Sequence, residues 1–585
     1  MRGKRCIPAR GMACQSVMVA RDIGQRQPCR PDGASMTWPL PQRRFQHCHH
    51  QHCAFAHCRR GRDMRTALEA SACHPRVNHH HHASHDFARM AVIWGLLSLC
   101  LAVWLNLIWL WPSLGPEVAW LSYGRLAPLQ HHLLLFGLGG SAMIAGGYSI
   151  AMHSVLQRES RTDAETAIPD IALPPFTLKL MHFTFLCWQA VVALGALAIV
   201  AGYSSGQYMA EAPWLVDLLM TLVWLAVAWV FFTMLEQRTL RRLPVACWYF
   251  IAGLMLVLIQ HVLISLSVPI GLLESIPLFT GSLEALIQRW QAGPLPGGMF
   301  AFGLIALLHH MVTSRSRLPL YSHRLATTSF WMLMLLVTWG GAPLLFASAL
   351  PAWSQTLGMA MGILLLAPGL ALSLNGLMTL KEDWHSLRRD PLNCLLAAAL
   401  ISFALAILEY SLLSLPTINA LTFSAANSLS PAASLGVVAT VAIVMAYHLL
   451  PPMRSLALLK THALLAIIGT LLCIAASWAT TLLQGSMWHV LADDGRPLYT
   501  LSEVLEAARM PMMISLGGLA CWALGLLLML LNVTRTLADQ KSERQAAHER
   551  QRLNSGSRKA SSEPAMHSAS PSTTPPATSS GGHYA

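Results

Sequence analysis

Residues 213–235 have the sequence PWLVDLLMTLVWLAVAWVFFTML, an apolar run that contains a single charged side chain, Asp217. An α-helix rises 1.5 Å per residue, so roughly 20 such residues cross the hydrocarbon core of a bilayer. The stretch therefore predicts a membrane-spanning α-helix.

Apolar stretches of spanning length recur on both sides of this one and bring the total to twelve. They lie at about 90–112, 129–152, 178–203, 213–235, 244–268, 296–316, 325–350, 355–380, 392–415, 429–451, 459–482 and 511–535. The sequence of 585 residues is 54% hydrophobic and 11% charged, too few charges to cover a soluble surface. We predict an all-α fold, a polytopic membrane protein of twelve transmembrane helices in the bacterial cytoplasmic (inner) membrane.

The excess positive charge gives the orientation of these helices. The net charge is +13, and Lys and Arg gather in alternate connections, which argues for topology signals and against nucleic-acid binding. The rich connections carry Arg158, Arg161, Arg238, Arg241, Arg242, Arg315, Arg317, Arg324, Lys381, Arg388, Arg389 and Arg454, and the poor ones Arg125, Arg289, Arg496 and Arg509. The positive-inside rule then places both termini in the cytoplasm.

The two ends of the chain lack the apolar content of a packed core. Residues 1–89 form a Cys, His and Arg-rich extension and residues 536–585 a polar tail, and we predict both to be disordered around a membrane domain of residues 90–535. The extension contains candidate zinc ligands and a histidine tract: His47, Cys48, His49, His50, His52, Cys53, His57, Cys58 and His79 to His82. Alternatively, translation starts later, at Met64 or Met90, and the extension is a mis-called start.

Four ionisable residues within the predicted spans are candidates for function. His131 and His132 begin the second span, His261 lies toward the outer end of the fifth, and Glu409 toward the outer end of the ninth. They share one depth and could meet if these three helices are neighbours. Intramembrane ionisable groups must be paired, hydrated or metal-bound. For His131 and His132, a place among the headgroups is the alternative explanation, and for His261 it is a hydrogen bond to a carbonyl oxygen or to Ser265.

Several segments resemble subunit I of cbb3-type cytochrome c oxidases, the C family of haem-copper oxygen reductases. Residues 121–140, LSYGRLAPLQHHLLLFGLGG, are similar to the segment that enters the second helix of that subunit. Further stretches agree in the same order: PWLVDLLMTLVW from Pro213, WYF at Trp248, QHVLISLSVP from Gln260, LPAWSQTLGM from Leu350, NGLMTL from Asn375, RRDP from Arg388 and QGSMW from Gln484. The resemblance covers residues 86–535 and implies a bundle like that of haem-copper oxidase subunit I.

The resemblance also implies cofactors, because six histidines of that family hold haem b, haem b3 and copper. His261 falls on a copper ligand and is the candidate metal residue, while His131 and His132 are candidates for haem binding. Glu409 coincides with a family glutamate and is a candidate for proton or cation handling. The other five histidine positions hold Gln130, Pro343, Leu344, Leu429 and Pro431, and Val337 stands at the position of the family's redox tyrosine. Residues 324–384 and 410–447 contain no histidine, so most ligands are missing in any register.

Three functional interpretations follow. The first is a noncatalytic paralogue, a degenerate relative with an assembly, regulatory or ligand- and metal-handling role. The second is an active or altered haem-binding oxidoreductase that uses His131, His132 and His261. The third is a transporter that reuses His261 and Glu409. The resemblance implies membrane-anchored c-type cytochrome subunits as partners. Any c-type haem must belong to such a partner, because the chain has no Cys-x-x-Cys-His.

Overall fold

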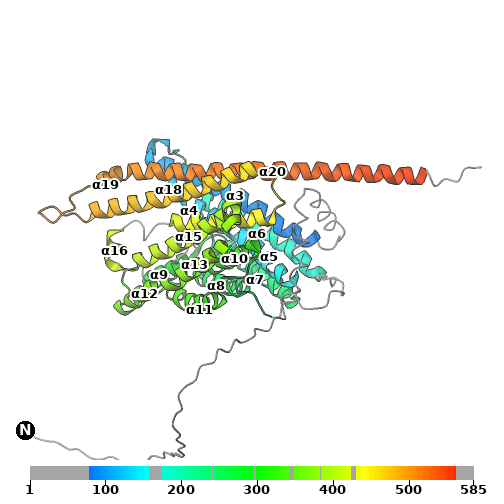
Figure 1. Cartoon of the computed structure of the whole chain (residues 1–585). Coiled ribbons are helices and arrows are strands. Elements are labelled where there is room, and N and C mark those ends of the chain that lie inside the picture. The colour runs from blue at the N-terminus through cyan, green and yellow to red at the C-terminus, as the bar shows by residue number, and fades with distance from the viewer. Residues whose placement is uncertain are drawn as a thin grey trace, which may run out of the picture. The chain divides into compact units, whose positions relative to one another are not determined.

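A computed structural model describes residues 78–156, 174–238, 242–293, 298–341, 345, 348–382, 384–422 and 430–560. These ranges are helical except for their connections and one antiparallel two-stranded hairpin. They belong to one compact unit that starts at His74, and Figure 1 shows its helices. The predicted all-α membrane fold is confirmed.

The helices in chain order are α3 (Asn78–Leu110), η1 (Pro112–Leu114), η2 (Ala119–Leu121), α4 (Tyr123–His132), η3 (Leu133–Gly140), α5 (Ser141–Leu156), α6 (Pro175–Ala201), α7 (Trp214–Glu236), α8 (Val245–Ser265), α9 (Gly281–Ala292), α10 (Gly298–Ser316) and α11 (His323–Val337). They continue as α12 (Ala352–Leu364), α13 (Leu366–Glu382), α14 (Trp384–Arg389), α15 (Pro391–Leu413), α16 (Pro416–Leu421), η6 (Ala432–Ala439), α17 (Thr440–Leu449), α18 (Leu456–Trp488), α19 (Leu501–Ala507) and α20 (Arg509–Ala560). Strands β1 (Ser267–Pro269) and β2 (Ser275–Pro277) pair between α8 and α9.

Ten helices in the described ranges are long and apolar enough to cross a membrane. They correspond to ten of the twelve predicted spans, and the two others fall on α10 and α11. α10 is a helix of 19 residues at the predicted place. α11 has 15 residues and ends at Val337, so the predicted span to residue 350 is too long.

The early end of α11 has a local cause. Gly341 has φ +100°, and a Cβ there would lie 2.6 Å from the backbone nitrogen of Trp290 on α9. Gly341 lies four residues beyond the last helical residue, and its left-handed conformation and the close approach of α9 do not allow one continuous helix to reach residue 350. Pro343 follows shortly and cannot continue the helix.

The first helix begins earlier than predicted. α3 starts at Asn78, so residues 78–89 are helical and only residues 1–77 lie outside the described part of the extension. Phe87 is fully buried and packs edge to face against Tyr148 and Phe185. The polar composition of this stretch concealed an apolar face formed by Ala83, Phe87 and Ala91 at helical spacing. The candidate zinc ligands of residues 47–58 lie outside the described residues, and the side chains of His79 to His82 do too.

The predicted disorder after residue 535 is wrong as far as Ala560. α20 continues without a break to that residue, as the red helix of Figure 1 shows, and residues 561–585 lie outside the described part. Low apolar content excludes a packed core, but it does not stop a helix that has already formed. Propagation adds a hydrogen bond for each residue fixed, whereas nucleation is the unfavourable step.

Packing between helices distant in sequence forms the interior. α20 packs most extensively against α18, α10 against α8, and α3 against α20, η3 and α5. Two segments, η3 and η6, are π-helical and entirely buried, and they contact each other. π-Helical turns are rare and occur often at functional sites. Here η6 directly follows Pro431, and η3 begins three residues after Gln130, the two being positions that the resemblance assigns to haem ligands.

Candidate functional site

A buried imidazole lies between α7 and α8. His261 on α8 is 1% exposed, and its Nε2 lies 3.1 Å from the Asp217 carbonyl oxygen on α7. Its Nδ1 is buried without a hydrogen-bond partner. Ser265, one turn along α8, lies beside the Asp217 carboxyl group, and its hydroxyl is also buried and unpartnered. The ring of His261 therefore faces a polar interior from which lipid is excluded.

A second carboxyl group approaches from the connection between α6 and α7. Glu211 accepts a hydrogen bond from the Met209 backbone nitrogen at 3.1 Å through Oε1, while its Oε2 is buried without a partner. Met209 has φ 60°, a strained conformation, and Gln291 of α9 donates to its carbonyl oxygen at 3.1 Å. Burial raises the pKa of Glu211 to about 7, and the backbone hydrogen bonds oppose this rise.

We name Glu211, Asp217, His261, Ser265 and Gln291 the Glu211–His261 cluster. One polar atom in each of Glu211, His261, Ser265 and Gln291 is buried and unpartnered, and each such atom costs free energy unless water or an ion satisfies it. Two carboxyl groups and an imidazole in one buried site can exchange protons or hold ordered water. Sequence reasoning found His261 but missed Glu211. Asp217, the single charge in the apolar run, was the signal for the site.

The other candidate histidines lie elsewhere. His132 is buried, its Nε2 lies 3.1 Å from the Val192 carbonyl oxygen on α6, and its Nδ1 has no partner. His131 is half-buried and contacts the ring of Tyr208 edge to face, with ring centroids 6.2 Å apart. The guanidinium carbon of Arg289 lies 5.1 Å from the centroid of the same Tyr208 ring. His131, which lies near the end of α4, therefore packs against the aromatic ring of Tyr208.

Glu409 is 7% exposed on α15, and its Oε2 accepts a hydrogen bond from Ser430 at 2.5 Å. Ser430 directly precedes Pro431, so this carboxyl group lies at the entrance to η6. α15 packs against η6, α8 against α7 and α10, and α4 against α3 and α6. The three helices that carry the sequence candidates thus have different main neighbours, and each candidate has its own local partner. Within the described ranges, no three His, Cys, Asp or Glu side chains are arranged to hold a metal ion.

The positions where the resemblance expects haem and copper ligands or the redox tyrosine also face separate surroundings. Gln130 donates to the Ser98 hydroxyl on α3 at 3.2 Å. Val337 is buried in α11, and its carbonyl oxygen accepts from the Trp290 indole at 3.0 Å. Pro431 lines a pocket beside α18. Pro343, Leu344 and Leu429 lie outside the described residues.

A group of histidines at the opposite end of the bundle was not predicted as a cluster. His310 of α10 lies edge to face with His153 of α5 and His448 of α17, at ring-centroid distances of 5.2 and 6.1 Å. The Ser149 hydroxyl lies 3.3 Å from Nε2 of His310. His310 is 4% exposed, so its ring lies inside the bundle. The sequence signal for this group is that His153, His310 and His448 lie at the same depth, at one end of three spans.

Residues 83–520 match the family described as Cytochrome C and Quinol oxidase polypeptide I. The chain belongs to this haem-copper oxidase subunit I family. It is 36% identical over 464 residues to Cbb3-type cytochrome c oxidase subunit CcoN1 of Stutzerimonas stutzeri, covering 78% of this chain and 94% of the relative. It is also 29% identical to cytochrome c oxidase subunit 1 of Rhodobacter capsulatus over 76% of this chain and 84% of the relative.

The fold of this chain is also similar to that of a solved structure. A heme-copper terminal oxidase dimer analysed by cryo-EM matches with a TM-score of 0.56 at 12% identity, over 77% of this chain and 84% of the matched chain. At that identity, the match supports the fold alone. The predicted family is confirmed by the family match and the 36% identical relative, and the bacterial relatives agree with a bacterial multi-pass membrane protein.

Proposed function

We propose that this chain is a noncatalytic member of the haem-copper oxidase subunit I family, with an assembly, regulatory or ligand- and metal-handling role. The observation that carries the proposal is the separation of the remaining donors. His132 faces α6, His261 faces α7, and His131 packs on Tyr208. Haem iron and copper need nitrogen donors that converge on one point. The residues present do not fit either group, and no chemical step is derived through them.

The substituted positions support the same conclusion. Proline and leucine side chains have no lone pair for a metal, and Gln130 is engaged with Ser98. Residues 324–384 and 410–447 contain no histidine that could substitute from a neighbouring register. Reduction of oxygen requires a haem iron facing a copper held by several imidazoles, and a copper held by His261 alone would not be competent.

The location and partners are part of the proposal. Alternate connections rich in Arg and Lys favour the bacterial inner membrane with both termini in the cytoplasm. An assembly or regulatory role would bring the chain into contact with membrane-anchored c-type cytochrome subunits. The Glu211–His261 cluster would serve proton, water or cation handling, and Glu409 with Ser430 a second site of the same kind.

A haem-binding oxidoreductase with altered ligands is the second candidate. One observation favours it: His132 is buried and its Nδ1 has no partner, directly before the π-helical segment η3. A π-helical turn changes the register of a helix, which is the change that a neighbouring histidine would need to replace Gln130. The rest of the donor set gives this candidate no second axial ligand.

The test is a reduced-minus-oxidised absorption spectrum of the purified full chain, with metal analysis of the same sample. The Stutzerimonas stutzeri relative, prepared identically, is the positive control. We expect no stoichiometric b-type haem band and no copper. A stoichiometric band that disappears in His132→Ala but not in His182→Ala, an exposed histidine on α6, would establish the altered oxidoreductase and refute the noncatalytic proposal.

A further inference from the structure

A cavity of about 480 Å³ lies where α3 ends and α20 begins. Part of its lining is apolar and comes from Ile108, Leu110, Leu505 and Met512. The rest includes two charged side chains, Glu506 of α19 and Arg509 of α20, and the phenol of Tyr123 on α4. A molecule in this cavity would therefore meet a positive charge, a negative charge and an apolar surface.

The two charges of this cavity form an ion pair that leaves both groups available. Arg509 donates through Nη1 to Oε1 of Glu506 at 3.0 Å, and both side chains are more than a third exposed. No described residue accepts a hydrogen bond from the other N–H groups of Arg509. A guanidinium has five N–H donors, and a carboxylate accepts several hydrogen bonds. Such exposed pairs contribute little to stability, so a ligand with the complementary charges can bind to both groups.

Aromatic side chains place this cavity at the depth of the lipid headgroups. Trp109 and Tyr123 line the cavity and are both exposed. Further exposed aromatic residues lie at the same end of the spans: Trp111, Trp120, Trp488 and Tyr499. Trp and Tyr are enriched where a bilayer meets water. Met510 and Ile514, one turn apart on α20, are exposed apolar side chains, as expected of a helix face in contact with acyl chains.

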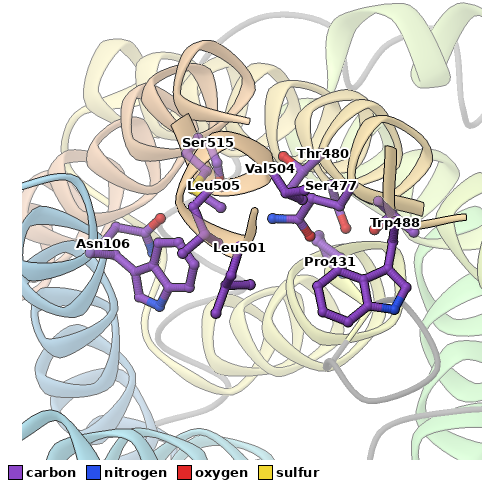
Figure 2. A pocket seen from close by; sticks show the side chains of 13 residues that line it. Asn106, Pro431, Ser477, Thr480, Trp488, Leu501, Val504, Leu505 and Ser515 are labelled. Atoms are coloured by element: carbon purple, nitrogen blue, oxygen red, sulfur yellow. The ribbon is translucent and has the colours of Figure 1, made fainter. Parts of the chain in front are cut away.

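A second cavity of about 380 Å³ adjoins the first, because Trp109, Leu505 and Met512 line both. No described side chain that lines it is charged. Hydroxyl and amide groups line it instead, and Figure 2 shows three of them, Ser477, Thr480 and Ser515. Thr480 and Gln484, one turn apart on α18, make no hydrogen bond with another described residue. The charged groups of the first cavity are thus followed by neutral hydrogen-bond donors.

This sequence of groups matches a phospholipid that has both charges in its headgroup. A phosphate would accept from Arg509, and an ammonium group would donate to Glu506. The ester carbonyl oxygens that follow accept hydrogen bonds, and the acyl chains are apolar. An ethanolamine headgroup meets all these requirements. A glycerol headgroup has no positive charge for Glu506, and the trimethylammonium of choline has no N–H to donate.

We propose that the two cavities together bind one phosphatidylethanolamine molecule, with its phosphate on Arg509, its ammonium group on Glu506 and its ester carbonyls at Thr480 and Gln484. The inference goes beyond the proposed noncatalytic function and does not depend on it, because none of these four residues stands at a haem or copper position. A lipid bound there would contact α3, α18, α19 and α20, and would stabilise their packing by mass action.

Native mass spectrometry of the delipidated full chain, released from detergent micelles, tests the site because it counts bound lipids. The probes are phosphatidylethanolamine, phosphatidylglycerol and phosphatidylcholine, each with one palmitoyl and one oleoyl chain. We expect the first equivalent of phosphatidylethanolamine to bind at least about fivefold more tightly than the first equivalent of either other lipid. Later equivalents coat the apolar surface and should show no such preference.

Substitutions of the ion pair test the assignment of each charge. Glu506→Gln should weaken binding of phosphatidylethanolamine about three- to tenfold and remove its preference over phosphatidylglycerol, whereas Glu506→Asp should retain the preference. Arg509→Gln should weaken the binding of all three lipids. Asp494→Asn and Arg496→Gln are the matched controls, because this exposed pair lies on the same connection and lines neither cavity, and they should leave binding unchanged.

A variant of the second cavity tests the ester contact separately. Thr480→Val removes a hydroxyl at similar size and should weaken phosphatidylethanolamine and phosphatidylglycerol by the same factor. The thermal unfolding midpoint of each lipid-free variant, compared with the native chain, separates loss of the site from misfolding. The inference is overturned if the three lipids bind alike or if Glu506→Gln keeps the preference. It is also overturned if glycerophosphoethanolamine, which has the headgroup without acyl chains, competes as well as the lipid, because the site would then recognise a soluble phosphate ester.

Discussion

Replacing Glu211 by glutamine should remove a pH dependence from the stability of the membrane domain. In the folded chain, burial raises the pKa of Glu211 from 4.5 to about 7. The folded state therefore binds more protons than the unfolded state between these values, and stability falls as pH rises through that window. The contribution is complete below about pH 4.5 and lost above about pH 7.

The expected magnitude follows from the size of the pKa change. At about 1.4 kcal/mol per pH unit, a rise from 4.5 to about 7 corresponds to about 3 kcal/mol of unfolding free energy between pH 4.5 and pH 8. Glu211→Gln keeps an oxygen that can accept from the Met209 nitrogen and cannot ionise. The variant should equal or exceed the native chain in stability at pH 8 and lose the advantage toward pH 4.5.

Thermal unfolding in detergent, followed by tryptophan fluorescence at half-unit steps from pH 4.5 to 8, measures the effect. Glu117→Gln is the matched control, because Glu117 is exposed on the connection after α3. Subtracting the variant curve from the native curve isolates Glu211 from Asp217, which is present in both. If the stabilities of the native chain and the variant change in parallel between pH 4.5 and 8, Glu211 is ionised throughout that range, and this would contradict its burial.

Four further substitutions, one of them a control, test the packing by the same unfolding assay. Gly341→Ala should lower the free energy of unfolding by more than about 2 kcal/mol, because it adds a clash with α9 to the strained φ. Gly206 has φ +73° with open space around it, so Gly206→Ala should lose only the conformational part, about 1 kcal/mol. Equal losses would contradict the clash. Phe87→Ala should lose about 3–5 kcal/mol, and a loss under 1 kcal/mol would place residues 78–89 outside the core. Ser430→Ala leaves Glu409 without its hydroxyl donor and should lose about 1–3 kcal/mol, so an unchanged midpoint would mean that water replaces it.

The spans were predictable because the bilayer demands length and apolar character, which a sequence displays directly. The errors arose where a local property decided the structure. The left-handed φ of Gly341 and its close approach to α9 do not allow α11 to continue to residue 350, and neither is visible in a hydropathy pattern. α20 passes residue 535 because helix propagation needs no apolar face.

The candidate site was predictable only in part. Depth along a span could be read from the sequence and identified His261 and Glu409 as buried polar groups. Direction around the helix could not, because neighbouring helices decide it. Gln260 donates to the Trp290 carbonyl oxygen of α9, while His261, one residue later, faces α7, as expected for a turn of about 100° per residue. Contacts from connections, such as that of Glu211, depend on a backbone path that hydropathy does not describe.

The length of α20 has a mechanical consequence. Residues 536–560 continue the helix by about 37 Å at 1.5 Å per residue. Ala560 itself therefore lies that length of helix beyond residue 535, and it turns with the span to which it is joined. Because α20 also packs along α18 and α3, a pull or twist applied at its far end would be transmitted as a lever into the wall of the pocket beside Pro431.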